Sequence, residues 1–175
     1  MNRLILIAVA LALFLGGTGA SRAQSPMPSQ AFKDWRYSCL AQQAAAGTTA
    51  PSAPKQICLI QHEVRNGGNL ILAARVRLIG PQKQPVLLFF LPPSVGAKTP
   101  VGFAVDQRTS ATTQVRECNA QLCWAVVPIG DDLLGSLKAG QQLAVVVKPG
   151  AGESRLLVSL SGFTSAFTAL QSAVQ

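Results

Sequence analysis

The stretch QICLIQHEVRNGGNLILAARVRLI, residues 56–79, predicts a β-hairpin and decides the fold class. Residues 56–64 and 70–79 are apolar runs of strand length, and the turn signal Asn66-Gly67-Gly68-Asn69 lies between them. The two runs therefore predict two antiparallel strands joined by a tight turn.

The second of these strands has two unlike faces, because successive side chains of a strand point to opposite sides. Arg75 and Arg77 lie on one predicted face, and the other face is apolar, made of Leu70, Leu72, Ala74, Val76 and Leu78. We interpret the two arginines as solvated strand residues and not as ligand-binding residues, since antiparallel sheets commonly have one face in water.

The strand that follows predicts the centre of the molecule. Residues 86–91, VLLFFL, are apolar on both faces, which is typical of a central strand covered on both sides. Pro92 and Pro93 end this strand, and residues 101–106 predict a further short one.

A second hairpin is predicted around ECNAQLCW, residues 117–124. The strands TTQVREC, residues 112–118, and CWAVV, residues 123–127, flank a connection of four residues. Cys123 and Trp124 are adjacent in a strand and should face opposite sides. We interpret Trp124 as a core or inter-sheet anchor and not as part of a site.

The chain before the first hairpin predicts one more strand and a loop. Residues 34–40, DWRYSCL, have the alternating pattern of a half-buried strand, with Trp35, Tyr37 and Cys39 on one face. Residues 41–55 are small, polar and proline-containing, which predicts a flexible loop.

The C-terminal third predicts helices and a last hairpin. Residues 131–140 predict a short helix with Asp131 as N-cap and Gly140 as its end. Residues 142–148 and 155–160 predict a hairpin, and four apolar residues then recur at helical spacing, Phe163, Phe167, Leu170 and Val174. About eight short strands at regular intervals predict an antiparallel β-sandwich, with a compact barrel as the alternative.

The first 23 residues have the pattern of a secretory signal peptide. Asn2-Arg3 gives a positive start, Leu4 to Leu15 is an apolar run of 12 residues, and Ser21-Arg22-Ala23 is a small-x-small cleavage pattern. The apolar run is shorter than the roughly 20 residues of a membrane-spanning helix. We expect export, no transmembrane span in the mature form, and a single domain over residues 24–175.

The charge of the chain favours anionic partners without specifying one. The chain has 15 basic and 7 acidic side chains, and removal of residues 1–23 leaves 13 basic residues and a net charge of +6. The basic residues are scattered and no nucleic-acid-binding motif accompanies them, so we expect no nucleic acid. Weak attraction to lipopolysaccharide, anionic lipid or host polyanions is the expected consequence.

The four cysteines predict disulfides, because export places them in an oxidising compartment. Three pairings are possible, and we favour Cys39 with Cys58 and Cys118 with Cys123, since each pair joins neighbours that a hairpin or short loop can bring together. A thiol oxidoreductase usually has C-x-x-C at the start of a helix, and this chain lacks it. No paired spacing typical of a structural zinc site is present either.

The sequence offers little material for catalysis. His62 is the only histidine and lies in a predicted strand, where we interpret it as a structural residue and not as a catalytic base. The segment GESRL, residues 152–156, lacks the closing glycine of a nucleophile elbow, and the acidic residues are mostly isolated. We therefore predict a protein that is not an enzyme, with no catalytic residue, cofactor or metal.

A series of segments resembles the invasion associated locus B family of exported bacterial proteins. They are FKDWRYSC, CLIQHEV, VLLFFLPPSV, ECNAQLCWAVVPI, DDLLGSLKAGQQL and SLSGFTSAFTAL, in family-like order from about Phe32 to Leu170. The resemblance implies an immunoglobulin-like β-sandwich, the disulfides Cys39 to Cys58 and Cys118 to Cys123, and a location in the periplasm or envelope. In pathogens this family is associated with entry into host cells, notably erythrocytes.

Two functional hypotheses follow from the sequence. The first is an exported, non-enzymatic envelope protein that acts by surface binding to an unknown envelope or host-surface protein or polyanion. The alternative is a periplasmic envelope-homeostasis or chaperone-like factor that holds clients on exposed strand edges. The expected location is the periplasm, with the outer membrane or the exterior as alternatives.

Overall fold

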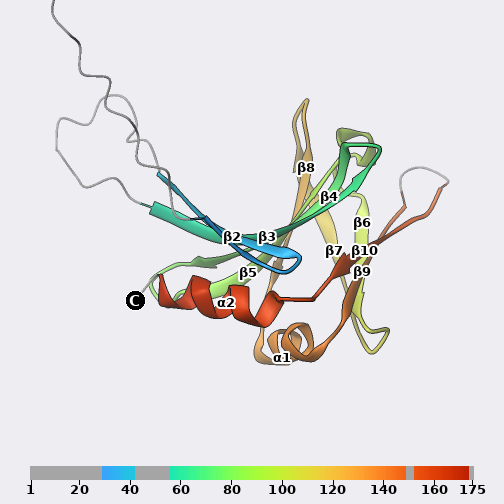
Figure 1. The fold of residues 1–175 in the computed structure, drawn as a ribbon. Coiled ribbons are helices and arrows are strands. Elements are labelled where there is room, and N and C mark those ends of the chain that lie inside the picture. Colours follow the sequence, from blue (N-terminus) through green and yellow to red (C-terminus); the bar gives the residue numbers. More distant parts are fainter. Residues whose placement is uncertain (1–28, 42–55, 149–151, 174–175) are drawn as a thin grey trace, which may run out of the picture.

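The computed structural model describes residues 29–41, 56–148 and 152–173 (Figure 1). The predicted signal peptide, residues 1–23, lies outside the described residues. The predicted loop over residues 41–55 does so as well except for Ala41, which is the last residue of a strand.

The described chain forms ten strands and two α-helices (Figure 1). The strands are β1 (Ser29–Phe32), β2 (Trp35–Ala41), β3 (Gln56–Asn66), β4 (Asn69–Ile79), β5 (Gln84–Leu91), β6 (Pro100–Val105), β7 (Thr109–Cys118), β8 (Cys123–Pro128), β9 (Gln142–Val147) and β10 (Ser154–Ser159). The helices are α1 (Asp131–Ala139) and α2 (Phe163–Ser172), and a 3₁₀ turn, Pro93–Val95, follows β5.

The strands pair antiparallel in the order β1-β2-β3-β4-β5-β8-β7-β6-β9-β10. β7 belongs to two sheets: residues 109–114 pair with β6, and Val115, Glu117 and Cys118 pair with β8. The register with β8 shifts between Val115 and Glu117. We call β1 to β5 with β8 the first sheet, and β6, β9 and β10 the second sheet.

The structure confirms the predicted fold class, an all-β, immunoglobulin-like sandwich of antiparallel strands with two short helices and two disulfides. Within the described residues, β1 and β10 end the strand order and do not pair with each other. The sheet therefore does not close into the alternative barrel.

The hairpin of β3 and β4 forms as its sequence predicts. Gly67 and Gly68 make the turn with φ of 53° and 86°, and a two-residue turn with positive φ at both positions matches the twist of the flanking strands. Side chains at these positions would strain the backbone, so the glycines fix the register of the hairpin.

The core lies between the two sheets and beneath α2. Its largest fully buried side chains include Trp35, Phe89, Phe163 and Phe167. The Trp35 and Phe163 rings meet edge to face with centroids 5.0 Å apart, which joins α2 to β2. α2 lies across the first sheet in Figure 1 and contacts β1 to β4.

Two disulfides close the sequence-neighbour pairs that the sequence favours. Cys39 and Cys58 are directly opposite on β2 and β3, and Cys118 and Cys123 are opposite at the tip of β7 and β8. The side-chain Oδ1 of Asn119 accepts hydrogen bonds from the backbone of the same short connection, at 2.8 and 2.9 Å. Residues 117–124 therefore form a hairpin tip that is closed by a disulfide.

Three local features differ from what the sequence indicates. The sequence does not predict β1, because SQAF has no clear alternation of apolar and polar residues. The N-cap of α1 is Gly130 and not Asp131. Asp131 lies in the first turn, where the helix dipole stabilises a carboxylate. β5 is central as predicted, but only its inner side chains face the core, and Leu88 and Phe90 on its other face are half-buried.

Candidate functional site

The register of the first sheet brings together residues from five strands on the face away from the core. One row across the sheet runs from Arg36 through Gln61, Arg75 and Leu88 to Val126. Directly opposed side chains are about 5 Å apart at Cβ, so this row is a contiguous surface.

The neighbouring row on one side contains Arg77, which lies opposite Leu59 and Val86. The row on the other side pairs Phe90 with Trp124. We call Arg36, Arg75, Arg77, Phe90 and Trp124 together the arginine face.

Arg75 is held in place by an aromatic ring. Its guanidinium carbon lies 4.6 Å from the centroid of the Phe90 ring, within the range of a cation–π interaction. Its Nε is buried and has no hydrogen-bond partner. The stack therefore orients the guanidinium while one donor stays unsatisfied, a costly arrangement for a buried N–H.

The arginines of this face are not neutralised. Within the described ranges, the ion pairs are Arg65 with Glu63 at 2.8 Å and Lys148 with Glu153 at 3.0 Å. Neither Arg36 nor Arg77 has an ion-pair partner there. Three like charges on one sheet face repel each other, so the face favours an anionic partner.

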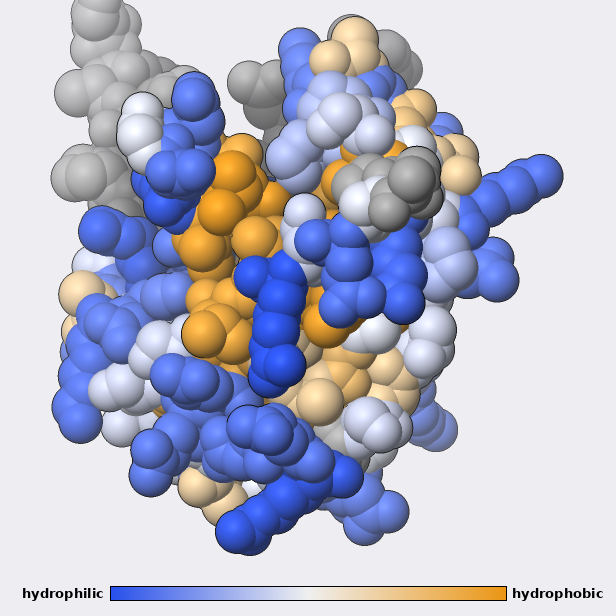
Figure 2. Space-filling view, turned by 90° about the vertical axis from the view of Figure 1, so that its right-hand side faces the viewer, coloured by the Kyte–Doolittle hydropathy of each residue, from blue (hydrophilic) through white to orange (hydrophobic). Residues whose placement is uncertain are grey.

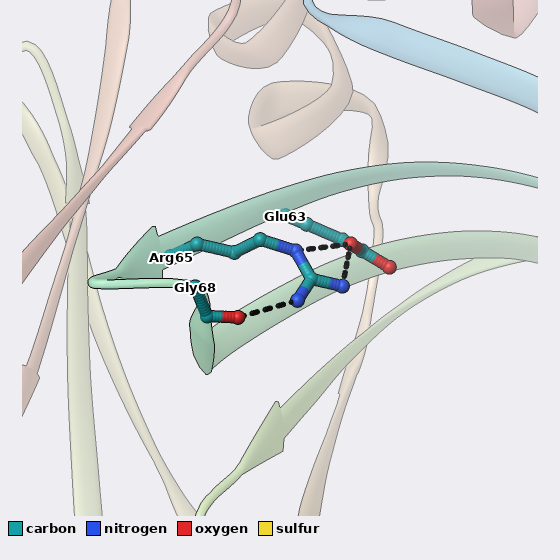
Figure 3. Close-up of polar contacts among 3 residues, drawn as sticks. All are labelled: Glu63, Arg65 and Gly68. Atoms are coloured by element: carbon teal, nitrogen blue, oxygen red, sulfur yellow. Dashed lines mark hydrogen bonds and ion pairs between the residues drawn. The ribbon is translucent and has the colours of Figure 1, made fainter.

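One acid on this face, Glu63, is paired with an arginine outside the arginine face (Figure 3). The Arg65 Nε and Nη2 atoms lie 3.1 and 2.8 Å from the same carboxylate oxygen of Glu63, and Nη1 donates to the Gly68 carbonyl at 2.9 Å. Arg65 therefore links Glu63 to the hairpin turn, and Glu63 forms no ion pair with Arg75.

Trp124 corrects the sequence interpretation. Cys123 is fully buried, and Trp124, its neighbour on the strand, is half-buried on the outer face beside Phe90. The tryptophan is therefore part of the candidate site and not a core anchor. Arg75 and Arg77 face away from the core as predicted, although Arg75 is stacked on a ring and not simply solvated.

A polar cluster joins the start of β2 to the end of β10. The Ser159 hydroxyl donates to the Asp34 carboxylate at 2.6 Å, and the Trp35 Nε1 donates to the Ser159 carbonyl at 2.8 Å. The His62 Nδ1 lies 2.7 Å from the Asp34 carbonyl, which can only accept, so Nδ1 carries the proton.

This cluster is a structural latch. The Ser159 hydroxyl is bonded to Asp34 and not to His62, so the histidine is not placed to take its proton. The geometry agrees with the interpretation of His62 as a structural residue. Burial raises the pKa of the nearby Tyr37 phenol, whose oxygen lies 2.8 Å from the Cys39 Sγ.

Two further observations concern the described residues alone. No three of their His, Cys, Asp and Glu side chains gather where they could hold a metal ion. None of their helices is long and apolar enough to cross a membrane.

The sequence profile of the family described as invasion associated locus B (IalB) protein matches residues 35–171. The chain belongs to this family. The match extends from the first residue of β2 into the last turn of α2 and so contains the arginine face and both disulfides. None of the curated proteins matches the chain.

A solved structure has a similar fold, the crystal structure of invasion associated protein b from Bartonella henselae. The TM-score is 0.67 at 20% sequence identity, over 83% of this chain and 96% of the Bartonella chain. At this identity the likeness shows that the IalB chain shares the Bartonella fold, and the arginine face rests on the geometry of this chain alone.

Proposed function

We propose that this IalB-family protein is an exported, non-enzymatic envelope protein that acts by surface binding, from the periplasm or the outer surface of the cell. The predicted signal peptide supports export. The latch that occupies His62 and Ser159 supports a role without catalysis.

The observation that carries the proposal is the arginine face. Three guanidinium groups without an ion-pair partner lie on the same sheet face as two half-buried aromatic rings, one of which is stacked under Arg75. Disulfides join β2 to β3 and β7 to β8. Arginine and aromatic side chains are enriched at binding hot spots because they combine directed hydrogen bonds with large contact area. A rigid sheet keeps them in place before a partner arrives, which lowers the entropy lost on binding.

We also propose a role in host-cell entry for this protein. The family name and the Bartonella relative are both associated with invasion in their descriptions. In a pathogen, the same surface would face the host cell and take part in entry, including entry into erythrocytes. In a free-living bacterium it would bind another envelope component.

The proposal is tested by crosslinking in intact cells. We expect the wild-type protein to capture a reproducible envelope or host-surface component, and the double variant R36Q/R77Q to lose it. The matched control is K148Q/R155Q, which removes two charges from the second sheet and should retain capture. Absence of any reproducible partner, together with a deletion strain of normal envelope integrity and host-cell entry, counts against the proposal.

A chaperone-like role is the second candidate, and a different surface favours it. β10 ends the strand order, and its Leu157 side chain is 47% exposed. Figure 2 views the molecule from the side of β9 and β10 and shows an apolar area crossed by hydrophilic side chains. Such an edge can pair with an extended client.

This second candidate predicts suppression of the aggregation of a denatured model substrate. The variant L157K should reduce the suppression, whereas R36Q/R77Q should not. A wild-type protein with no effect on aggregation removes the candidate.

A further inference from the structure

The arginine face continues into exposed aliphatic side chains at one end. Leu40 lies two residues after Ser38 on β2, and Ile79 lies two residues after Arg77 on β4, so both point away from the core. They are 52% and 45% exposed. We call Leu40 and Ile79 the aliphatic end.

Basic character extends past the arginines in the other direction across the sheet. Val126, at the end of the Arg75 row, lines a hollow of about 480 Å³ together with Pro128. Lys98 and Arg116 also line this hollow, and neither is in an ion pair within the described chain. Lys98 and Arg116 therefore add two basic side chains beyond the edge of the first sheet, where the exposed carboxylate of Glu117 also lies, opposite Trp124 on β8.

The outer face of the second sheet differs in both respects. Its Lys148 is neutralised by Glu153, and its concave part is formed by small residues, including Gly102 and Ala144. Arg155 is its one exposed arginine on the described strands, next to Leu157 in the alternation of β10. The second sheet thus has one exposed aliphatic side chain beside one arginine, whereas the outer face of the first sheet has Leu40, Ile79 and three arginines without an ion-pair partner.

We propose that the arginine face and the aliphatic end together bind an anionic phospholipid surface. Guanidinium groups form paired hydrogen bonds with phosphate oxygens. Exposed aliphatic side chains at the same face can then enter the region between head groups, where they leave water. Aromatic side chains favour the boundary between polar head groups and acyl chains, and Trp124 is on the same face to make this contact.

The aliphatic end distinguishes a lipid surface from a soluble polyanion. An anionic polysaccharide would satisfy the arginines but would leave Leu40 and Ile79 in water, whereas a phospholipid surface satisfies both. This inference rests on the proposed function, because it names the partner class of the same surface.

The test is co-sedimentation of the protein with vesicles of phosphatidylcholine alone or mixed with phosphatidylglycerol. The protein is purified in the form that the cells produce after export. We expect binding to the mixed vesicles and little to the neutral ones. Each basic residue near an anionic surface strengthens binding about five-fold, so R36Q/R77Q should weaken it about 25-fold. The control K148Q/R155Q removes the same charge from the other sheet and should change binding less than about five-fold.

A second pair of variants tests the aliphatic contact. L40S should weaken binding to mixed vesicles about ten-fold through loss of apolar burial, and the control L157S on the second sheet should not. Both leucines are about half exposed, 52% and 47%, so neither variant should unfold the protein. Circular dichroism and a urea transition for each variant verify the fold.

Three results would overturn the inference. The first is equal sedimentation with neutral and mixed vesicles. The second is an equal loss of vesicle binding in R36Q/R77Q and K148Q/R155Q, because binding would then depend on net charge and not on the arginine face. The third is binding of soluble dextran sulfate through Arg36 and Arg77 without binding to vesicles. In that third case the partner is a polysaccharide, and the proposed surface-binding function stands without the lipid partner. The crosslinking experiment in intact cells tests the surface-binding function separately.

Discussion

The two faces of the first sheet are made by alternate residues of the same strands and have different roles. Phe89 is fully buried in the core, and Phe90, the next residue, lies under a guanidinium on the outer face. Cys123 and Trp124 divide in the same way. One set of side chains holds the two sheets together, and the other forms a charged surface.

The difference shows how a short sequence encodes both stability and a binding surface. The inner set is apolar and includes the disulfide at each of two strand pairs, so it fixes the strands in place. The outer side chains are positioned by the same strands, and few contacts among them are needed beyond the stack of Arg75 on Phe90. Substitutions on the inner face should therefore change the free energy of unfolding, and those on the outer face should change binding.

Adjacent phenylalanines give the largest contrast. Phe89→Ala should lower the free energy of unfolding by about 3 to 5 kcal/mol, because it leaves a cavity in the core. Phe90→Ala should lower it by about 1 to 2 kcal/mol through lost partial burial and the lost stack with Arg75. Urea unfolding of both variants measures this, and equal costs would mean that the two faces are not distinct.

The disulfides on the inner face come next. Loss of the Cys39–Cys58 bond in C39S/C58S should cost about 3 kcal/mol, and loss of the Cys118–Cys123 bond in C118S/C123S about 2 kcal/mol, because the first closes the longer loop. Thermal unfolding of the two variants beside the wild type checks the order. A reversed order would contradict loop closure as the main source of their stabilisation.

A smaller effect on stability, with a larger one on binding, is expected at Arg75. Arg75→Gln removes the cation–π contact and should cost about 0.5 to 1 kcal/mol of stability, while it weakens binding to anionic vesicles about five-fold. Arg75→Lys keeps the charge but not the planar group, so it should recover part of the binding. Unchanged binding in both variants would remove Arg75 from the site.

The smallest effect concerns Tyr37 on the inner face. Burial raises its pKa above the ordinary phenol value of 10.0, so the folded protein keeps the phenol proton to higher pH than the unfolded chain does. The stability that this confers is present below about pH 10 and is lost as the pH rises above it. Urea midpoints at pH 8 and pH 10.5 should differ more for the wild type than for Tyr37→Phe, and equal differences would contradict the assignment.

Local signals were enough to predict most of the fold. Gly67-Gly68 and the alternation on either side predict the β3–β4 hairpin, and short separation favours the observed cysteine pairs. β1 was missed because its four residues carry no alternation of their own and are recognisable only by pairing with β2.

The candidate site could be predicted only in part. Alternation places Arg75 and Arg77 on one face of a strand, and it places Trp124 opposite Cys123. For a strand that is apolar on both faces, such as β5, alternation does not say which face lies in the core. The pairing of Phe90 with Trp124 requires that β5 lie beside β8, the third strand after it in the chain, and this long-range register is set by the whole core.

The central claim is that the outer face of the first sheet meets an anionic lipid surface, and Trp124 reports it most directly. Trp35 and Trp124 are the two tryptophans of the chain, so the emission of the wild type minus that of Trp124→Phe isolates Trp124. We predict that this difference spectrum shifts to shorter wavelength on addition of phosphatidylglycerol vesicles and is quenched when their acyl chains are brominated. A difference spectrum that stays unchanged while the protein sediments with the vesicles would contradict the claim, because binding would then use another face.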